Sequence, residues 1–249
     1  AKINARSLLK MMEFEINGLQ ELKKYANSDL LLIPEVLSID TLDDFVIVIM
    51  SWMDFEQGDE EILGKGLAEL HLNSSKDNLK RFGSNIDGFI GFNKQLQGWK
   101  ENWPEFFVEL RLLPQMKQAK SWGLDLTKYQ TLLKLILNKL KIHTPKPSLV
   151  HGDLWRGNCG ISKNKKGIIL DPAVYWGDRE VDIAMTYLFG GFSHKFYKGY
   201  ESIWKLPKDF EERIDIYNLY HILNHANMFG GSYKQQSINK LSDLHSKLT

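Results

Sequence analysis

The sequence has little cysteine, no long apolar run and no excess of charge of either sign. Cys159 is the single cysteine in 249 residues, which excludes an intramolecular disulfide and a metal site built from several thiolates. The longest apolar stretch, residues 45–53, falls well short of the roughly 20 residues that span a bilayer. With 32 basic and 31 acidic residues the formal charge is +1, so no general attraction to nucleic acid is expected. These absences predict a reducing, cytoplasmic location with neither a membrane nor a nucleic-acid partner.

The residues that are present have the composition of a folded, globular protein. Apolar residues make up 43% of the chain and charged residues 25%. Apolar residues recur every three or four positions over residues 7–26, which predicts an amphipathic helix. Residues 45–50 are continuously apolar and predict a fully buried strand. Because residues 51–59 separate strand-like from helical patterns, we expect a hinge there, between a small part at 1–53 and a larger, mainly helical part at 54–249.

The remaining chain is expected to form further strands, turns and helices. We expect a strand at 36–39, a turn at 40–44, a glycine- and aromatic-rich loop at 81–102, and a hairpin at 159–170. Further helices are expected at residues 60–73, 104–120, 127–142, 180–189, 194–203, 208–226 and 233–247.

The segment HGDLWRGN at residues 151–158 carries the chemistry. Phosphoryl transfer needs a carboxylate that orients the attacking hydroxyl and accepts its proton. It also needs oxygen ligands that hold Mg²⁺. Asp153 suits the first role, whereas Asn158 and Asp171, at the end of the predicted hairpin, suit the second. The alternative is that these are three turn-forming residues without a common function.

Lys2 and Glu15 are candidates for holding the phosphates of ATP. A strand lysine that bridges the α- and β-phosphates needs a carboxylate to hold it, usually from the helix that follows. Glu15 lies beside the buried face of the helix predicted at residues 7–26. Glu13 competes for this role, and ordinary surface charge is the alternative for the pair.

Two segments are similar to motifs of one known family. HGDLWRGN matches a family loop with the sequence HGDLWSGN, and residues 171–185 match the pattern DPAxxxGDRExDxAM. On these motifs, and on Phe189-Gly-Gly-Phe192, the chain resembles the fructosamine kinase (ketosamine kinase) family, which is related to aminoglycoside and choline kinases. The resemblance runs through most of the chain. It implies an α+β, two-lobed, protein-kinase-like fold, with an antiparallel sheet in a small N-terminal lobe and a large, mainly helical C-terminal lobe.

The resemblance also implies a role for each candidate residue. Asp153 would be the catalytic base, with Asn158 and Asp171 as the metal ligands. Lys2 would bind the phosphates of ATP, and Glu15 would hold Lys2 in place.

The same resemblance implies the substrates. Met50, Ser51, Trp52 and Met53 would form the stretch whose backbone meets adenine. ATP and Mg²⁺ would be required, and the acceptor would be a small-molecule or protein-linked ketosamine such as a fructosamine or ribulosamine. Phosphorylation at the third carbon of the sugar makes such an adduct fall apart, so the implied process is deglycation.

Three further residues are candidates for contacting the acceptor. Trp155 either stacks on a sugar ring or packs beneath the catalytic loop. Arg156 stands where the family has serine, and its guanidinium either meets a phosphate or an acidic group of the substrate or points to solvent, of which we favour solvent. Glu180 either contacts substrate or, as we favour, starts the next helix and braces the loop.

The start of the chain departs from the family pattern. The family has a glycine-rich hairpin before the phosphate-binding lysine, whereas only Ala1 precedes Lys2 here. We expect that the natural N-terminus lies upstream, with a truncated protein as the alternative. A kinase for another small metabolite and an inactive, nucleotide-binding pseudokinase are the competing functions. The presence of Asp153, Asn158 and Asp171 favours activity, and the sequence does not predict an oligomeric state.

Overall fold

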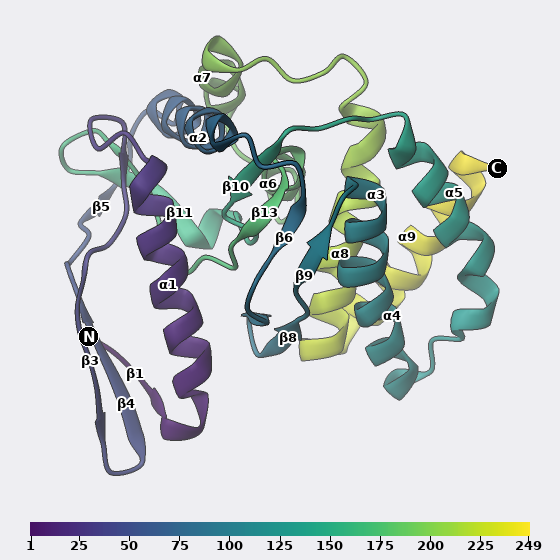
Figure 1. Ribbon diagram of the computed structural model, residues 1–249, viewed down its shortest axis with the longest axis horizontal. Helices are drawn as coiled ribbons and strands as arrows, with labels where there is room; N and C mark the ends of the chain where they lie inside the picture. Colours follow the sequence, from purple (N-terminus) through teal and green to yellow (C-terminus); the bar gives the residue numbers. More distant parts are fainter. The chain divides into compact units, whose positions relative to one another are not determined.

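The structure, a computed structural model, describes residues 1–249 in two compact units that each combine several chain segments (Figure 1). Unit 1 contains Ala1–Asn78, Ser148–Val174 and Thr186–Leu206, and unit 2 contains Leu79–Pro147, Tyr175–Met185 and Pro207–Thr249. No helix combines the length and the apolar character that crossing a membrane requires. The lobe boundary after Met53 stays a prediction.

Unit 1 holds two sheets and three α-helices. Its helices are α1 (Leu9–Tyr25), α2 (Glu61–Ser74) and α7 (His194–Ile203), and its strands are β1 (Lys2–Ala5), β2 (Leu31–Leu32), β3 (Val36–Leu42), β4 (Phe45–Met50), β5 (Phe55–Glu56), β11 (Cys159–Ser162) and β12 (Gly167–Ile169). Strands β1, β4 and β3 form an antiparallel sheet, and β2, β12, β11 and β5 form a second sheet. Strand β10 (Pro147–Val150) leads into the HGD segment.

Helix α1 packs on one face of the β1–β4–β3 sheet (Figure 1). Met12 of α1 lies against Val46 and Val48 of β4, and all three side chains are buried. Lys2 pairs with Val48 across the strands, so its side chain lies on the face that the helix covers. The predicted helix and the strand at residues 45–50 are confirmed. The strand is not fully buried as predicted, because it covers the helix with one face only and leaves Phe45 and Ile49 exposed. The predicted turn after residue 39 is too long, because β3 continues to Leu42.

The predicted hairpin is confirmed as β11 and β12, with Cys159 opposite Ile169. Cys159 is buried there, and burial raises the pKa of its thiol to about 12. This cysteine therefore packs as a small apolar residue and is not a reactive thiolate.

Helices α2 and α7 lie against each other at glycines (Figure 1). A Cβ atom at Gly64 would lie 2.0 Å from the Phe196 carbonyl oxygen, and one at Gly199 would lie 2.2 Å from the Glu61 carbonyl oxygen. Only glycine permits this approach, so the start of α7 is held firmly against α2.

Unit 2 is mainly helical. Its helices are α3 (Trp103–Phe107), α4 (Leu113–Ala119), α5 (Gln130–Lys141), α6 (Glu180–Thr186, whose last residue belongs to unit 1), α8 (Glu211–Phe229) and α9 (Ser232–Leu248), and its strands are β6 (Phe82–Ser84), β7 (Gly88–Ile90), β8 (Asn93–Gln95), β9 (Gly98–Lys100) and β13 (Tyr175–Asp178). Buried aromatic rings of Trp103, Phe107 and Tyr217 form the centre of its core, with ring centroids 5.1–6.0 Å apart.

Two expectations for this part of the chain are wrong. Residues 81–102 form the four strands β6–β9 and not an irregular loop. Their glycines suggested a loop, but Gly83 and Gly98 have φ values of +133° and +139° and let β6 and β9 approach closely. Helix α6 ends at Thr186 and does not reach residue 189, because the backbone turns left-handed at Phe189.

Candidate active site

His151 ties the start of the HGD segment to the strand that precedes Asp171. Its Nε2–H donates a hydrogen bond to the Leu170 carbonyl oxygen at 2.9 Å, and its Nδ1 accepts one from the Asp153 backbone N–H at 3.3 Å. The Ala173 N–H donates to the His151 carbonyl oxygen at 2.8 Å. Two loops distant in sequence are thus fixed on either side of one buried imidazole. The sequence analysis assigned no role to His151. Its position two residues before Asp153 was the signal that could have identified it as a residue that orders the loop.

Asn158 closes the same loop. Its side-chain Nδ2 donates to the Asp153 carbonyl oxygen at 2.9 Å and lies 3.4 Å from Asp153 Oδ2. Its own carbonyl oxygen accepts from the Leu170 N–H at 2.9 Å. Because the amide nitrogen is engaged, the side-chain oxygen Oδ1 is the atom that can face a cation.

Asp171 sits at a left-handed turn, with a φ of +54°. Aspartate tolerates this conformation better than most residues, and the following Pro172 disfavours a helical backbone at position 171. Gly18 of α1 lies directly against Pro172, so α1 approaches the turn closely. The Asp171 side chain is 46% exposed, and its Oδ1 lies 3.1 Å from Lys2 Nζ.

Lys2 is held between two carboxylates. Its Nζ donates to both oxygens of Glu15, at 2.7 and 2.8 Å, as well as to Asp171. Burial opposes the charge on Lys2, but the carboxylates of Glu15 and Asp171 outweigh burial and raise the pKa of Lys2. Glu13, the competing partner, is exposed. The structure therefore brings Lys2, Glu15 and Asp171 together.

The stretch from Met50 to Met53 runs on from β4. The Ser51 N–H donates to the Glu35 carbonyl oxygen at 2.8 Å, and Ser51 Oγ accepts from the Glu35 N–H at 2.9 Å. Trp52 is 84% exposed. The Ser51 N–H therefore already has a partner, and the role of residues 50–53 in binding adenine stays a prediction.

The indole of Trp155 lies over its own loop. A Cβ atom at Gly157 would lie 2.4 Å from the Trp155 ring, so the ring packs closely against the backbone of the loop. The edge of the ring meets Phe189 at a centroid distance of 6.4 Å. Trp155 remains 38% exposed.

The Arg156 side chain is 55% exposed, as expected for a residue that points to solvent, but its guanidinium also has partners within the chain. Arg156 Nη2 lies 2.5 Å from Glu60 Oε1, and its Nη1 lies 3.4 Å from the Gly191 carbonyl oxygen. Glu60 is distant in sequence, and no local pattern marked it as the partner of Arg156.

The fructosamine kinase family model matches residues 1–247. The chain belongs to the fructosamine kinase family. The family phosphorylates ketosamines, so this chain is a phosphotransferase that acts on a sugar hydroxyl and, as a kinase, uses ATP.

Known proteins show the same relationship. A probable ketoamine kinase of Vibrio parahaemolyticus is 40% identical over 247 residues, which cover 96% of this chain and 83% of that protein. A crystal structure of a putative fructosamine-3-kinase from Haemophilus somnus aligns with a TM-score of 0.87 at 29% identity, covering 98% of this chain and 82% of that chain. An ADP-bound aminoglycoside phosphotransferase aligns with a TM-score of 0.60 at 15% identity, covering 97% and 83% of the two chains. These likenesses confirm the predicted family and the α+β kinase-like fold.

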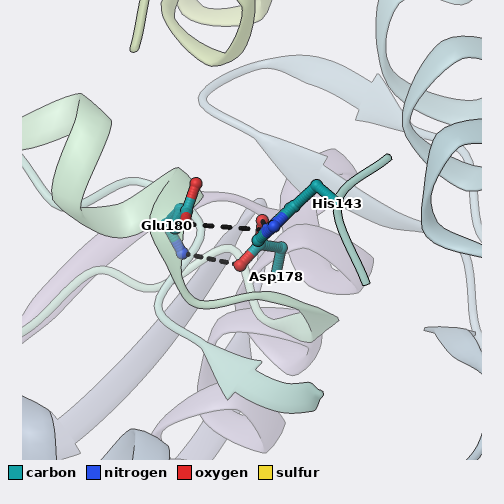
Figure 2. Close-up of side chains that lie close together, drawn as sticks. All are labelled: His143, Asp178 and Glu180. Atoms are coloured by element: carbon teal, nitrogen blue, oxygen red, sulfur yellow. Dashed lines mark hydrogen bonds and ion pairs between the residues drawn. The ribbon is translucent and has the colours of Figure 1, made fainter. Parts of the chain in front are cut away.

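In this fructosamine kinase family member Glu180 belongs to a buried cluster in unit 2. Figure 2 shows Glu180 beside Asp178 and His143. His143 Nε2 lies 2.8 Å from Asp178 Oδ2 and 3.6 Å from Glu180 Oε1. Arg213 donates to both oxygens of Glu180, at 2.7 and 2.8 Å, and the Tyr217 hydroxyl donates to Asp178 at 2.7 Å.

This cluster has the residue types of a metal site but not its chemistry. The candidate ligand atoms of His143, Asp178 and Glu180 lie within 4.8 Å of one another. Both Glu180 oxygens are nevertheless occupied by the Arg213 guanidinium, whose positive charge would oppose a cation. Glu180 begins α6, as predicted, and is 1% exposed. Its partner Arg213 belongs to α8 and not to the catalytic loop, so the bracing of that loop and a contact with substrate both stay predictions.

The His143–Asp178 pair predicts a pH-dependent stability. Burial opposes protonation of His143, but the hydrogen bond and charge of Asp178 outweigh burial and raise the pKa of His143. The stabilisation is therefore complete below the unfolded-state pKa of about 6.5 and is lost as pH rises through the higher folded-state pKa. From pH 6 to pH 9 we expect the Tm of the wild type to fall by about 2–4 °C more than that of His143→Gln.

Differential scanning calorimetry across that pH range measures this difference. His194→Gln, which changes an exposed histidine in α7, is the matched control and should follow the wild type. Parallel Tm profiles for the wild type and His143→Gln would show that the pair contributes no such stabilisation.

Proposed function

We propose that this chain transfers the γ-phosphoryl group of ATP to the hydroxyl on the third carbon of a ketosamine sugar. The observation that carries the proposal is the convergence of Lys2, Glu15 and Asp171, linked through Leu170 and His151 to the loop of Asp153. Unit 1 alone supplies all of these groups.

Asp153 is the proposed base. Its carboxylate accepts the proton of the sugar hydroxyl as that oxygen forms a bond to the γ-phosphorus, while the bond from this phosphorus to the β–γ bridging oxygen breaks and ADP departs. The hydrogen bond that the Asp153 N–H donates to His151 and the contact with Asn158 hold the loop so that the carboxylate keeps its direction.

Lys2 is the proposed phosphate ligand. Its ammonium group lies on the helix-facing side of the sheet, charged and held by Glu15. When the triphosphate binds, the ammonium can exchange its contact with Asp171 for phosphate oxygens while Glu15 keeps it in place. The backbone of Trp52 or Met53 is the proposed contact for adenine, next to Met50 and Ser51.

Asn158 and Asp171 fit Mg²⁺. They offer an amide oxygen whose partner nitrogen is already engaged and a half-exposed carboxylate, and both are hard oxygen donors. Bound Mg²⁺ would neutralise charge on the phosphates. The proposed roles of these two side chains are to hold the ion and to orient it through the backbone bond that joins Asn158 to Leu170.

The proposed acceptor is a ketosamine, free or on a protein, as the names of the relatives indicate. Trp155 offers an apolar ring face two residues from Asp153, which suits the C–H face of a sugar. Phosphorylation would lead to loss of the sugar from the amine, which is deglycation.

The test is ADP release with fructosyl-lysine and ribulosyl-lysine derivatives as acceptors, together with phosphorus NMR of the product. We expect one ADP for each phosphorylated ketosamine, with the phosphate on the third carbon. Free fructose, free lysine, choline and an aminoglycoside are the comparison acceptors. Turnover with choline or the aminoglycoside but with neither ketosamine would overturn the proposed acceptor.

A further inference from the structure

The loop between α6 and α7, residues 187–193, has an unusual backbone. Phe189, Gly190 and Gly191 have φ values of +53°, +100° and +66°. The two glycines adopt this backbone readily, but a left-handed phenylalanine is costly, so surrounding contacts must determine the conformation of Phe189.

The end of this loop is anchored by Glu60, the residue directly before α2. The backbone N–H of Ser193 donates to Glu60 Oε2 at 2.7 Å. Glu60 is only 15% exposed, and the glycine contacts between α2 and α7 keep the two helices in register. Ser193, at the beginning of α7, is therefore fixed relative to α2.

Arg156 joins this anchor to the catalytic loop. One nitrogen of its guanidinium contacts the second oxygen of Glu60, another lies near the Gly191 carbonyl oxygen, and the group lies 5.7 Å from the centre of the Phe192 ring. The arginine comes three residues after Asp153, so the loop is attached close to the proposed base.

We propose that Arg156 and Glu60 form a latch that holds residues 187–193 against the catalytic loop and thereby positions Trp155 for the acceptor. The latch is defined as the Arg156–Glu60 ion pair together with the bond from Ser193 to Glu60. Phe189, held by this loop, meets the edge of the Trp155 ring. This inference rests on the proposed function, because it assigns the latch to the acceptor side of that reaction.

The latch acts on the acceptor and not on ATP. It shares no hydrogen bond or ion pair with Lys2, Glu15 or Asp171, which form the proposed nucleotide side. Arg156 and Glu60 are positioning residues, since they act through Trp155 and the loop.

Steady-state kinetics of Arg156→Ala, Glu60→Ala and the double variant test the latch. We expect each single variant to raise the KM for a fructosyl-lysine derivative by about three- to tenfold, with an unchanged KM for ATP. The KM for the acceptor in the double variant should not exceed that of the more severe single variant, because each single substitution already breaks the same ion pair. Arg156→Lys, which keeps the charge, should recover part of the loss.

Lys195→Ala is the matched control. It breaks another ion pair on the same surface, between Lys195 and Asp59 at 3.0 Å, and should leave the KM for the acceptor unchanged. The latch would be contradicted if the increases in the KM for the acceptor seen in the two single variants multiplied in the double variant. It would also be contradicted if the KM for ATP rose as much as the KM for the acceptor.

Amide hydrogen exchange tests the latch without any turnover. The Ser193 amide loses its acceptor in Glu60→Ala, so a peptide covering residues 187–196 should exchange at least about tenfold faster at that position. Unchanged exchange would contradict the latch. If the wild type phosphorylated no ketosamine, the proposed function would fail while the exchange result would still stand.

Discussion

Replacing Asp153 with asparagine is expected to lower kcat for ketosamine phosphorylation by about 10³-fold. Asparagine has the same shape but cannot accept the proton of the attacking hydroxyl. The backbone bonds from Asp153 to His151 and from Asn158 to the Asp153 carbonyl oxygen do not depend on the carboxylate, so the loop should keep its conformation. ATP should therefore bind as it does to the wild type.

Two measurements separate chemistry from binding in this variant. Single-turnover kinetics report the chemical step, and calorimetric titration with an ATP analogue reports affinity. Asp40→Asn is the control, because it makes the same aspartate-to-asparagine change at an exposed position of β3. Its single-turnover rate and its affinity for the ATP analogue should match those of the wild type. A kcat for Asp153→Asn within about threefold of the wild type would remove Asp153 from the role of base.

Replacing Asp171 with asparagine is expected to lower kcat by about 10²- to 10³-fold and to raise the Mg²⁺ concentration needed for half-maximal rate. The variant loses a negative ligand for the cation and one of the two carboxylates around Lys2. Asparagine accepts a left-handed backbone as readily as aspartate, so the φ of +54° adds no strain to the variant.

Asp43→Asn is the control for this substitution. Asp43 is an exposed aspartate with a φ of +49° in the turn between β3 and β4, so it matches Asp171 in chemistry and in backbone conformation. Rates measured over a Mg²⁺ titration should be normal for Asp43→Asn. If Asp171→Asn shared the wild-type Mg²⁺ dependence, the cation would have to be held elsewhere.

Local patterns predicted the elements that hold the site. Apolar spacing alone located α1, and the short apolar runs on either side of a lysine-rich turn located β11 and β12. The order of elements then placed Asp171 after a hairpin, where the structure has it. Such predictions succeed because side-chain period and turn chemistry are properties of a few neighbouring residues.

The sequence could not predict contacts between distant residues. The pairing of Arg156 with Glu60 joins positions 96 residues apart, and neither position has a neighbour that reveals the other. Strands β6 and β9 were hidden for a related reason, since three-residue strands containing glycine are stabilised by their partners and not by their own propensity. His151 was visible in the motif, but its link to Leu170 appears only in three dimensions.

The most direct test of the account is a crystal structure with Mn²⁺ and a non-hydrolysable ATP analogue, in which anomalous scattering locates the ion. The account predicts an anomalous peak bonded to Asn158 Oδ1 and an Asp171 carboxylate oxygen, with Lys2 on the phosphates and still paired with Glu15. A peak at His143, Asp178 and Glu180, with none at Asn158 and Asp171, would contradict it.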